Sequence, residues 1–264
     1  MLKLKDIFVV FDTGTYLEKA ALRGINFEIG EHELVTVVGN AGCGKSTLLK
    51  LLSGHFRPNF GRIWLGNQDV TSQTLDERSK KFTFVSYNQE GGVAENLTVA
   101  ENLAVAGMHH QPRSIFTPAI NRETHEAYYE QLKQLDFFAM ENVLDEKVYD
   151  ISHMHKFILS LLVAIMKNAE VLLVDANIIG LVKEEQKALI DVMTKIIRSQ
   201  KTTAIIAAND PTFALEIADR TLVLSHGQVV ADLFGETKKK TKTEDLFAAF
   251  KIVPRIKDVK PSCL

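Results

Sequence analysis

A glycine-rich segment is the part of this sequence most suited to chemistry. Residues 39–47 fit the pattern G-x-x-x-x-G-K-[ST], with an apolar stretch before them and a helical pattern after them. Glycines let such a loop wrap closely around phosphate oxygens and turn its N–H groups inward. The helix that follows adds the positive charge of its N-terminal end. The segment therefore predicts a phosphate site in which Lys45 reaches the β- and γ-phosphates of a nucleotide and the Ser46 hydroxyl binds Mg²⁺.

We call residues 39–47 the phosphate loop. The loop residues expected to contact the nucleotide are Gly39, Asn40, Gly42, Cys43, Gly44, Lys45, Ser46 and Thr47. The alternative is a chance glycine-rich turn, and the strand before and the helix after argue against it.

A phosphate loop of this kind needs an acidic residue at the end of another strand to hold the metal. Asp175 directly follows the apolar residues 171–174, which are typical of a buried parallel strand. The alternative role for Asp175 is the N-cap of the next helix. The apolar run in front of it favours the metal role.

The patterns around these residues predict an α/β fold. Alternating or wholly apolar runs predict strands, and 3.6-residue periodicity predicts helices. Strand–helix–strand alternation on both sides of a helical region indicates a largely parallel sheet covered by helices. The expected strands are 4–11, 24–29, 34–38, 62–65, 82–87, 171–174 and 203–208, with a hairpin at 221–233. The expected helices are 46–52, 183–198, 213–218 and 244–251, several more lie within 97–167, and 238–242 reads as a basic linker.

Composition excludes several classes of protein. The 264 residues are 46% apolar and 24% charged with a formal net charge of −2, as in an ordinary soluble globular protein. That balance leaves no basic surplus for general nucleic-acid binding. Two cysteines, Cys43 and Cys263, make no disulfide framework, so a reducing cytosol is expected. The N-terminus has no signal-peptide pattern, and the longest apolar run, 157–166, is far short of the roughly 20 residues that span a bilayer.

In the order of its segments, the chain resembles the nucleotide-binding subunit of an ABC transporter over about residues 2–233, within a bacterial branch that serves importer-like systems. The resemblance implies a P-loop NTPase fold of the ABC ATPase type, with a mixed-sheet core, an antiparallel β subdomain and a helical insertion. It implies a nucleotide-binding domain at 1–235 with a helical subdomain at about 90–166. A basic linker, a short helix and a tail would occupy 236–264.

The same resemblance implies further site residues. Gln89 would sense the metal, the attacking water and the permease. Phe11 would stack on adenine, with Tyr16 as the other aromatic in reach. The alternative for either ring is a core aromatic at a strand end. The metal ligands would be Ser46, Gln89 and Asp175, and the cofactors ATP and Mg²⁺.

Four positions depart from the family pattern. The signature leucine-serine-glycine-glycine-glutamine is replaced by residues 151–155, Ile-Ser-His-Met-His, here called the signature segment. Ala176 occupies the position where the family has the glutamate that polarises the attacking water. Asn209 occupies the position of the family's switch histidine. The loop at Gly180 lacks the usual aspartate. Alanine cannot orient water, and asparagine can bond a phosphate but carries no charge.

These departures predict a subunit that binds ATP·Mg²⁺ and has given up hydrolysis. It would pair with a second ABC nucleotide-binding subunit, as a hetero- or homodimer, and couple to an integral-membrane permease on the inner face of the cell membrane. The alternative is a slow but genuine ATPase driving uptake of a small organic solute, with Gln89 and a partner's residue replacing the base. A third reading, a soluble ABC-type ATPase acting on nucleic acid, is disfavoured because such proteins usually carry two cassettes, so no nucleic-acid partner is expected.

Two other features have simpler explanations. The pair His109-His110, with His153 and His155, could suggest zinc, but the spacing is not that of a four-ligand site. Cys43 lies at a helix N-terminus, which lowers a thiol pKa and would make it reactive when the site is empty. A residue that only fills a variable loop position is the preferred reading of Cys43.

Overall fold

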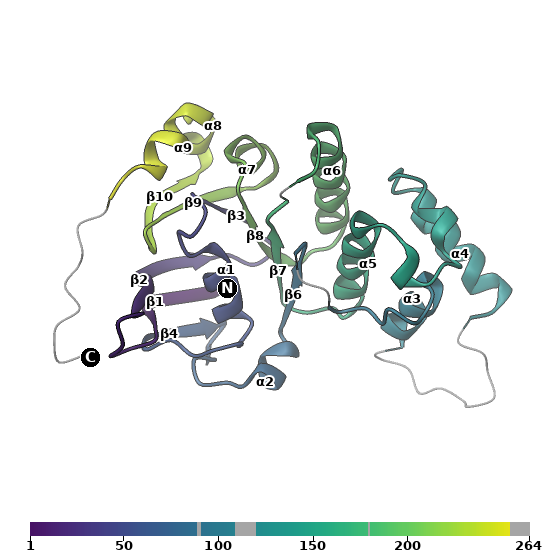
Figure 1. Ribbon diagram of the computed structural model, residues 1–264, viewed down its shortest axis with the longest axis horizontal. Helices are drawn as coiled ribbons and strands as arrows, with labels where there is room; N and C mark the ends of the chain where they lie inside the picture. Colours follow the sequence, from purple (N-terminus) through teal and green to yellow (C-terminus); the bar gives the residue numbers. More distant parts are fainter. Residues whose placement is uncertain (89–90, 109–119, 179, 254–264) are drawn as a thin grey trace. The chain divides into compact units, whose positions relative to one another are not determined.

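The computed structural model describes residues 1–88, 91–108, 120–178 and 180–253. The chain forms two compact units, each with its own packing. The first comprises 1–84, 170–177 and 202–264, and the second comprises 85–169 and 178–201. Figure 1 shows a first unit built on sheets and a second that is helical.

The first unit contains an antiparallel sheet in the strand order β2-β1-β4-β5. Its strands are β1 (Leu2–Phe11), β2 (Lys19–Ile29), β4 (Phe60–Leu65) and β5 (Gln68–Asp69). Strands β1 and β2 pair over almost their whole length, from Leu2 opposite Ile29 to Phe11 opposite Lys19. Both begin earlier than expected from sequence, because Leu2 of β1 and Ala21 and Leu22 of β2 are also buried in the paired strands.

A six-stranded sheet in the order β10-β9-β3-β8-β7-β6 forms the core. Strands β3, β7, β8 and β9 run parallel, and β10 is antiparallel to β9. Every residue of β3, β7 and β8 is buried, as expected for central parallel strands. The sheet is therefore mixed. The bounds are β3 (Leu34–Val38), β6 (Phe82–Ser86), β7 (Val171–Ala176), β8 (Thr203–Ala208), β9 (Arg220–Ser225) and β10 (Gln228–Phe234).

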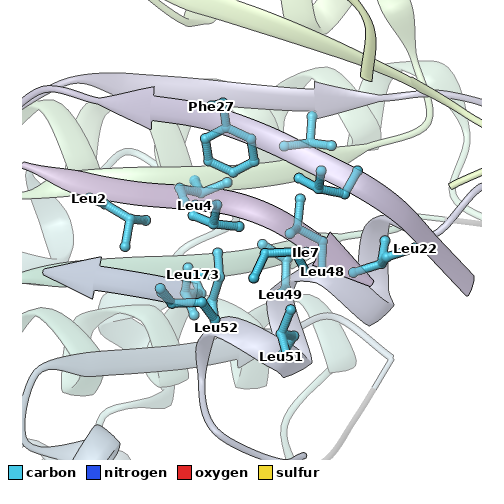
Figure 2. Packing of buried hydrophobic residues seen from close by; sticks show 14 of the residues in the cluster. Leu2, Leu4, Ile7, Leu22, Phe27, Leu48, Leu49, Leu51, Leu52 and Leu173 are labelled. Atoms are coloured by element: carbon cyan, nitrogen blue, oxygen red, sulfur yellow. The ribbon is translucent and has the colours of Figure 1, made fainter. Parts of the chain in front are cut away.

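Helix α1 (Lys45–Leu52) has buried leucines on more than one of its sides, and these hold it in the core. Leu48, Leu49, Leu51 and Leu52 are fully buried. Figure 2 shows them in one cluster with Leu4 and Ile7 of β1 and Leu173 of β7. Burying each leucine stabilises the fold by about 2 kcal/mol. This packing fixes the helix whose first turn belongs to the phosphate loop.

The remaining helices of the first unit are short. They are α2 (Leu75–Ser79), α7 (Pro211–Ile217), α8 (Gly235–Lys240) and α9 (Thr243–Phe250). Residues 238–242 were expected to form a linker, and this expectation is wrong, since α8 takes up most of that run. The lysines are accommodated in α8 because Lys239 pairs with Glu236 at 3.2 Å and Lys238 donates to the Ala218 carbonyl oxygen.

Apart from Val85 and Ser86 at the end of β6, the described residues of the second unit form helices and the loops between them. It contains α3 (Val99–Gly107), α4 (Arg122–Lys133), α5 (His153–Met166), α6 (Lys183–Ser199) and the 3₁₀ turns Met140–Val143 and Val148–Asp150. Capping boxes start α3 and α4, with Thr98 and Glu101 in the first and Asn121 and Thr124 in the second. Helix α5 packs against α3 and α6 through an almost wholly apolar surface.

Candidate nucleotide-binding site

The phosphate loop joins β3 to α1 and is pressed against neighbouring strands. A Cβ atom on Gly39 would lie 2.1 Å from the Leu224 carbonyl oxygen, closer than any side chain can approach. Gly44, the N-cap of α1, has a φ of 110°, and a Cβ there would lie 2.8 Å from the Ala21 carbonyl oxygen. Glycine is therefore needed at both positions, because the loop is wedged between β9 and β2.

Lys45 lies across the loop. Its Nζ donates to the carbonyl oxygens of Gly39, at 2.7 Å, and Asn40, at 3.1 Å. The side chain is buried, and these neutral carbonyl groups hold its amine in place. An anionic phosphate oxygen would be a stronger partner for it than either carbonyl.

The mouth of the loop suits a phosphate group. Asn40, Ala41 and Gly42 are exposed, and no atom lies within 4 Å of the space beside the Gly42 Cα. Gly44 provides no side-chain cap, and the first turn of α1, with Ser46 and Thr47, contains no acidic residue. The N–H groups of that turn are therefore left for an anion, and the Ser46 hydroxyl is the group that would hold Mg²⁺ beside it.

The carboxyl ends of three neighbouring strands meet beside this loop. Val38 of β3 is paired with Ala208 of β8, and Ala208 is paired with Ala176 of β7. Ligands of open parallel sheets bind at such an edge. Asp175 lies one residue before the end of β7, is buried, and is the acidic side chain that the sequence places for the metal.

Ala176 and Asn209 also lie at this edge, with a partner that the sequence reasoning missed. Ala176 is buried and offers no proton acceptor. The Asn209 Nδ2 donates to the Oδ1 of Asn177, so the residues that directly follow β7 and β8 are joined side chain to side chain. The signal that could have identified Asn177 was its position, immediately after the strand that carries Asp175.

The two aromatic residues expected near adenine differ in their surroundings. Phe11 ends β1, is 37% exposed, and packs edge to face on Phe56 with ring centroids 5.3 Å apart. Tyr16 lies in the β1–β2 turn and is 96% exposed. A ring already held on one side loses less conformational entropy on stacking, which favours Phe11. Gln89 lies outside the described residues.

The signature segment is tied into its own unit. The Ser152 Oγ accepts from the His155 N–H, at 3.3 Å, as the N-cap of α5, and also lies 3.1 Å from His155 Nδ1. His155 Nε2 lies 3.1 Å from the Phe138 carbonyl oxygen. Burial lowers the pKa of the His155 imidazole, although the Phe138 carbonyl opposes this. The Ser152 hydroxyl is therefore already hydrogen-bonded to a neutral His155.

His153 packs on the Tyr87 ring, with centroids 4.5 Å apart, and its Nε2 bonds the Tyr87 carbonyl oxygen. Both signature histidines thus have hydrogen-bond partners. The residues with described positions include no group of three or more side chains suited to a metal ion, and His109 and His110 lie outside them.

The Cys43 thiol is shielded. It is buried, and burial raises its pKa even though Lys45 Nζ lies 3.8 Å from Sγ. A cysteine that fills a loop position is thus the better reading. No helix in the part of the chain with described coordinates has the length and apolarity to cross a bilayer.

The loop, the strand order and the acidic strand end together define a P-loop nucleotide-binding protein. A family model described as ABC transporter matches residues 22–177, more than half of the chain. The chain belongs to the ABC transporter family, as an ATP-binding subunit whose ligands are ATP and Mg²⁺.

Curated relatives agree with this assignment. The tyrosine transport ATP-binding protein of Clostridioides difficile is 25% identical over 95% of this chain and 98% of its own length. The sulfate/thiosulfate import ATP-binding protein CysA of Methylococcus capsulatus is 32% identical over 79% of this chain. The match spans only 57% of CysA, and the match to the spermidine/putrescine import protein PotA of Mesoplasma florum spans 58% of that relative.

Solved structures confirm the fold. The dimeric cassette MJ0796 bound to ADP and Pi has a TM-score of 0.70 at 22% identity, covering 89% of this chain and 98% of that one. A nucleotide-free ATP-binding cassette from an ABC transporter has a TM-score of 0.69 at 19% identity, covering 97% and 96%. The expected ABC-type P-loop NTPase class, with its mixed and antiparallel sheets, is confirmed.

Proposed function

We propose that this chain is a pseudo-ATPase subunit of an import-type ABC transporter, which binds ATP·Mg²⁺ and hydrolyses it weakly or not at all. The observation that carries the proposal is the combination of a complete phosphate loop with Ala176 and Asn209 at the adjoining strand ends. When bound, ATP·Mg²⁺ would supply the reactive phosphate and its metal. The chain's own residues must supply everything that activates water.

The binding half of the site is present. Lys45 is positioned by the Gly39 and Asn40 carbonyls, and α1 directs its uncapped N–H groups into the loop mouth. Asp175 and Ser46 are the proposed metal ligands, joined by Gln89. Phe11 is the proposed adenine contact.

The hydrolytic half lacks a general base. Ala176 has no acceptor atom, and Asn209 is neutral and directed at Asn177. A positioned general base contributes roughly 10²- to 10⁴-fold in rate, so its loss alone makes turnover very slow.

The signature segment gives a second reason for slow turnover. His153, Met154 and His155 carry side chains where the family pattern has two glycines and a glutamine, so a nucleotide held by a partner subunit cannot approach this backbone as closely. The Ser152 hydroxyl is already bonded to His155. A partner's site facing this segment would also be weakened.

ATP-binding subunits of this family dimerise and work with membrane permease components. We therefore place this chain at the cytoplasmic face of a membrane, held by a permease and paired with a second nucleotide-binding subunit. An intact homologue is the favoured pair, since two copies of this chain would have two sites without a base. The importer names of its relatives, for tyrosine, sulfate and polyamines, support uptake of a small solute.

The test is ATP binding by calorimetry and phosphate release measured on the same purified protein. Lys45→Ala should abolish binding, whereas Lys50→Ala, a lysine near the other end of α1, should leave it unchanged. Wild-type binding without turnover above the Lys45→Ala background would support the proposal. Turnover that Lys45→Ala abolishes would overturn it in favour of a slow but genuine ATPase.

A gain-of-function pair makes the test sharper. Ala176→Glu places a carboxylate after the metal aspartate, and Ala176→Gln adds the same bulk without the charge. If the missing base limits hydrolysis, turnover should rise at least about tenfold with glutamate and not with glutamine. Equal rates in both variants would show that something else limits the reaction.

A further inference from the structure

The C-terminal helix α9 is bonded to the outside of the phosphate loop. The Asn40 Nδ2 donates to the Phe250 carbonyl oxygen at 3.4 Å. The Ser225 Oγ, from the end of β9, bonds the same oxygen at 3.1 Å and the Ile252 carbonyl oxygen at 2.7 Å. Carbonyl groups at a helix C-terminus have no partner within the helix, so these bonds satisfy groups that α9 cannot.

The turn that carries this connection also contacts the loop backbone. The Gly227 N–H donates to the Cys43 carbonyl oxygen at 3.0 Å, and the Arg23 N–H donates to the Gly227 carbonyl oxygen at 2.8 Å. A Cβ atom on Gly227 would lie 2.6 Å from the Ala21 carbonyl oxygen, so this turn packs closely against β2. Ser225 and Gly227 thus link α9 to the loop through hydrogen bonds.

Asn40 is where this link meets the nucleotide site. Its carbonyl oxygen accepts from Lys45 Nζ, at 3.1 Å, and from the Cys43 N–H, at 3.2 Å, while its side-chain amide holds Phe250. A phosphate that attracts Lys45 changes the balance of bonds at the Asn40 peptide. Any such change reaches the residue that holds the end of α9.

The other side of α9 is anchored by packing. Leu246 and Phe250 are buried, whereas Phe247 is 52% exposed. The helix is therefore held on one face by apolar contacts and at its end by the Asn40 and Ser225 bonds. Both attachments must persist for α9 to support the loop.

We propose that α9 is a positioning element of the nucleotide site, coupled to it through Ser225 and Asn40, so that nucleotide binding and the docking of α9 strengthen each other. The coupling is reciprocal by linkage: whatever loosens α9 weakens ATP binding by the same factor by which ATP tightens α9. The proposal rests on ATP binding at the loop and not on the absence of hydrolysis. It makes the C-terminal segment a means of regulating nucleotide affinity.

The first measurement is ATP affinity in two variants that loosen α9 from different sides. Ser225→Ala removes the donor to Phe250 and Ile252, and its control is Ser79→Ala, an exposed serine bonded to local backbone on α2. Leu246→Ala weakens the packing of α9, and its control is Phe247→Ala on the exposed side. We expect ATP affinity to fall about three- to tenfold in Ser225→Ala and Leu246→Ala and to stay unchanged in the controls.

The second measurement is amide hydrogen exchange in residues 243–250 with and without saturating ATP. If Ser225 had only a structural role, replacing it would not change the effect of ATP on this exchange. Exchange should slow when ATP binds to the wild-type protein. It should slow much less in Ser225→Ala, once urea unfolding has shown that this variant is folded. Wild-type affinity in Ser225→Ala, or α9 exchange indifferent to ATP, would overturn the coupling. Turnover by the wild-type protein would instead contradict the pseudo-ATPase assignment and leave the coupling intact.

Discussion

The Arg78 Nη1 lies 2.7 Å from the Leu52 carbonyl oxygen and 3.0 Å from that of Leu51, at the C-terminal end of the helix that follows the phosphate loop. Its Nε and Nη2 donate to the Val70 carbonyl oxygen. The guanidinium is almost fully buried, and burial lowers its pKa to about 10, so it is still charged at neutral pH. One side chain from α2 thus caps the C-terminal end of α1, the end away from the phosphate loop.

Replacing Arg78 with methionine should lower the free energy of unfolding by about 3 kcal/mol or more, because several buried carbonyl groups lose their donor at once. Urea unfolding measures the change. Arg62→Met is the matched control, since Arg62 is exposed and makes a surface pair with Asp69 at 3.4 Å, worth about 0.5 kcal/mol. Similar losses in the two variants would contradict the role assigned to Arg78.

Two glycines with the same φ allow backbone strain to be separated from a role in ATP binding. Gly42 in the phosphate loop and Gly14 in the β1–β2 turn both have a φ of 78° and open space around the Cα. Alanine at either position should cost about 1–2 kcal/mol of stability through the left-handed backbone. Only Gly42→Ala should also weaken ATP binding, measured by calorimetry. A comparable loss of ATP affinity in Gly14→Ala would show that the effect comes from general destabilisation.

The Asn177–Asn209 pair should behave as a coupled unit. In a double-mutant cycle of Asn177→Ala and Asn209→Ala, the unfolding free energies should be non-additive by about 1 kcal/mol, since either change alone breaks the bond between them. Asn59, which accepts from the Val10 N–H on β1, provides the control. Asn59→Ala should combine additively with Asn209→Ala. Additivity in the Asn177 cycle would exclude the pairing.

The signature segment should make stability depend on pH. Because the folded pKa of His155 is lowered, the unfolded chain takes up a proton there more readily than the folded one. The stability contributed by neutral His155 is complete above about pH 6.5 and is lost as the pH falls from there towards the folded pKa. His155→Gln should therefore lose less stability than wild-type protein between pH 7.5 and 5.5 in urea titrations.

Some pH dependence should remain in that variant. Burial also lowers the pKa of His55, with the Lys50 charge as a smaller cause, so this histidine titrates in the same direction. The double variant His55→Gln/His155→Gln should be flatter than either single variant. A wild-type pH profile in His155→Gln would contradict a neutral, half-buried His155.

The local chemistry of the site could be predicted from short stretches of sequence. The phosphate loop and the strand before Asp175 follow from contiguous residues whose backbone requirements are local, namely glycine where φ is positive and an apolar run where a strand is buried on both faces. The departures at Ala176, Asn209 and residues 151–155 became evident when the sequence was set against the pattern of the family that it resembles.

Tertiary structure decided what depends on residues far apart in the chain. The Asn177–Asn209 bond needs β7 and β8 in register, the contact of Asn40 with Phe250 spans 210 positions, and Arg78 reaches α1 across 26. Such contacts depend on loop closure and on the burial of polar groups that only the folded chain brings together. In α8, likewise, Lys238 donates to the carbonyl oxygen of Ala218, 20 positions away. Residue types thus determined what the site can do, and long-range packing determined which side chains hold it in place.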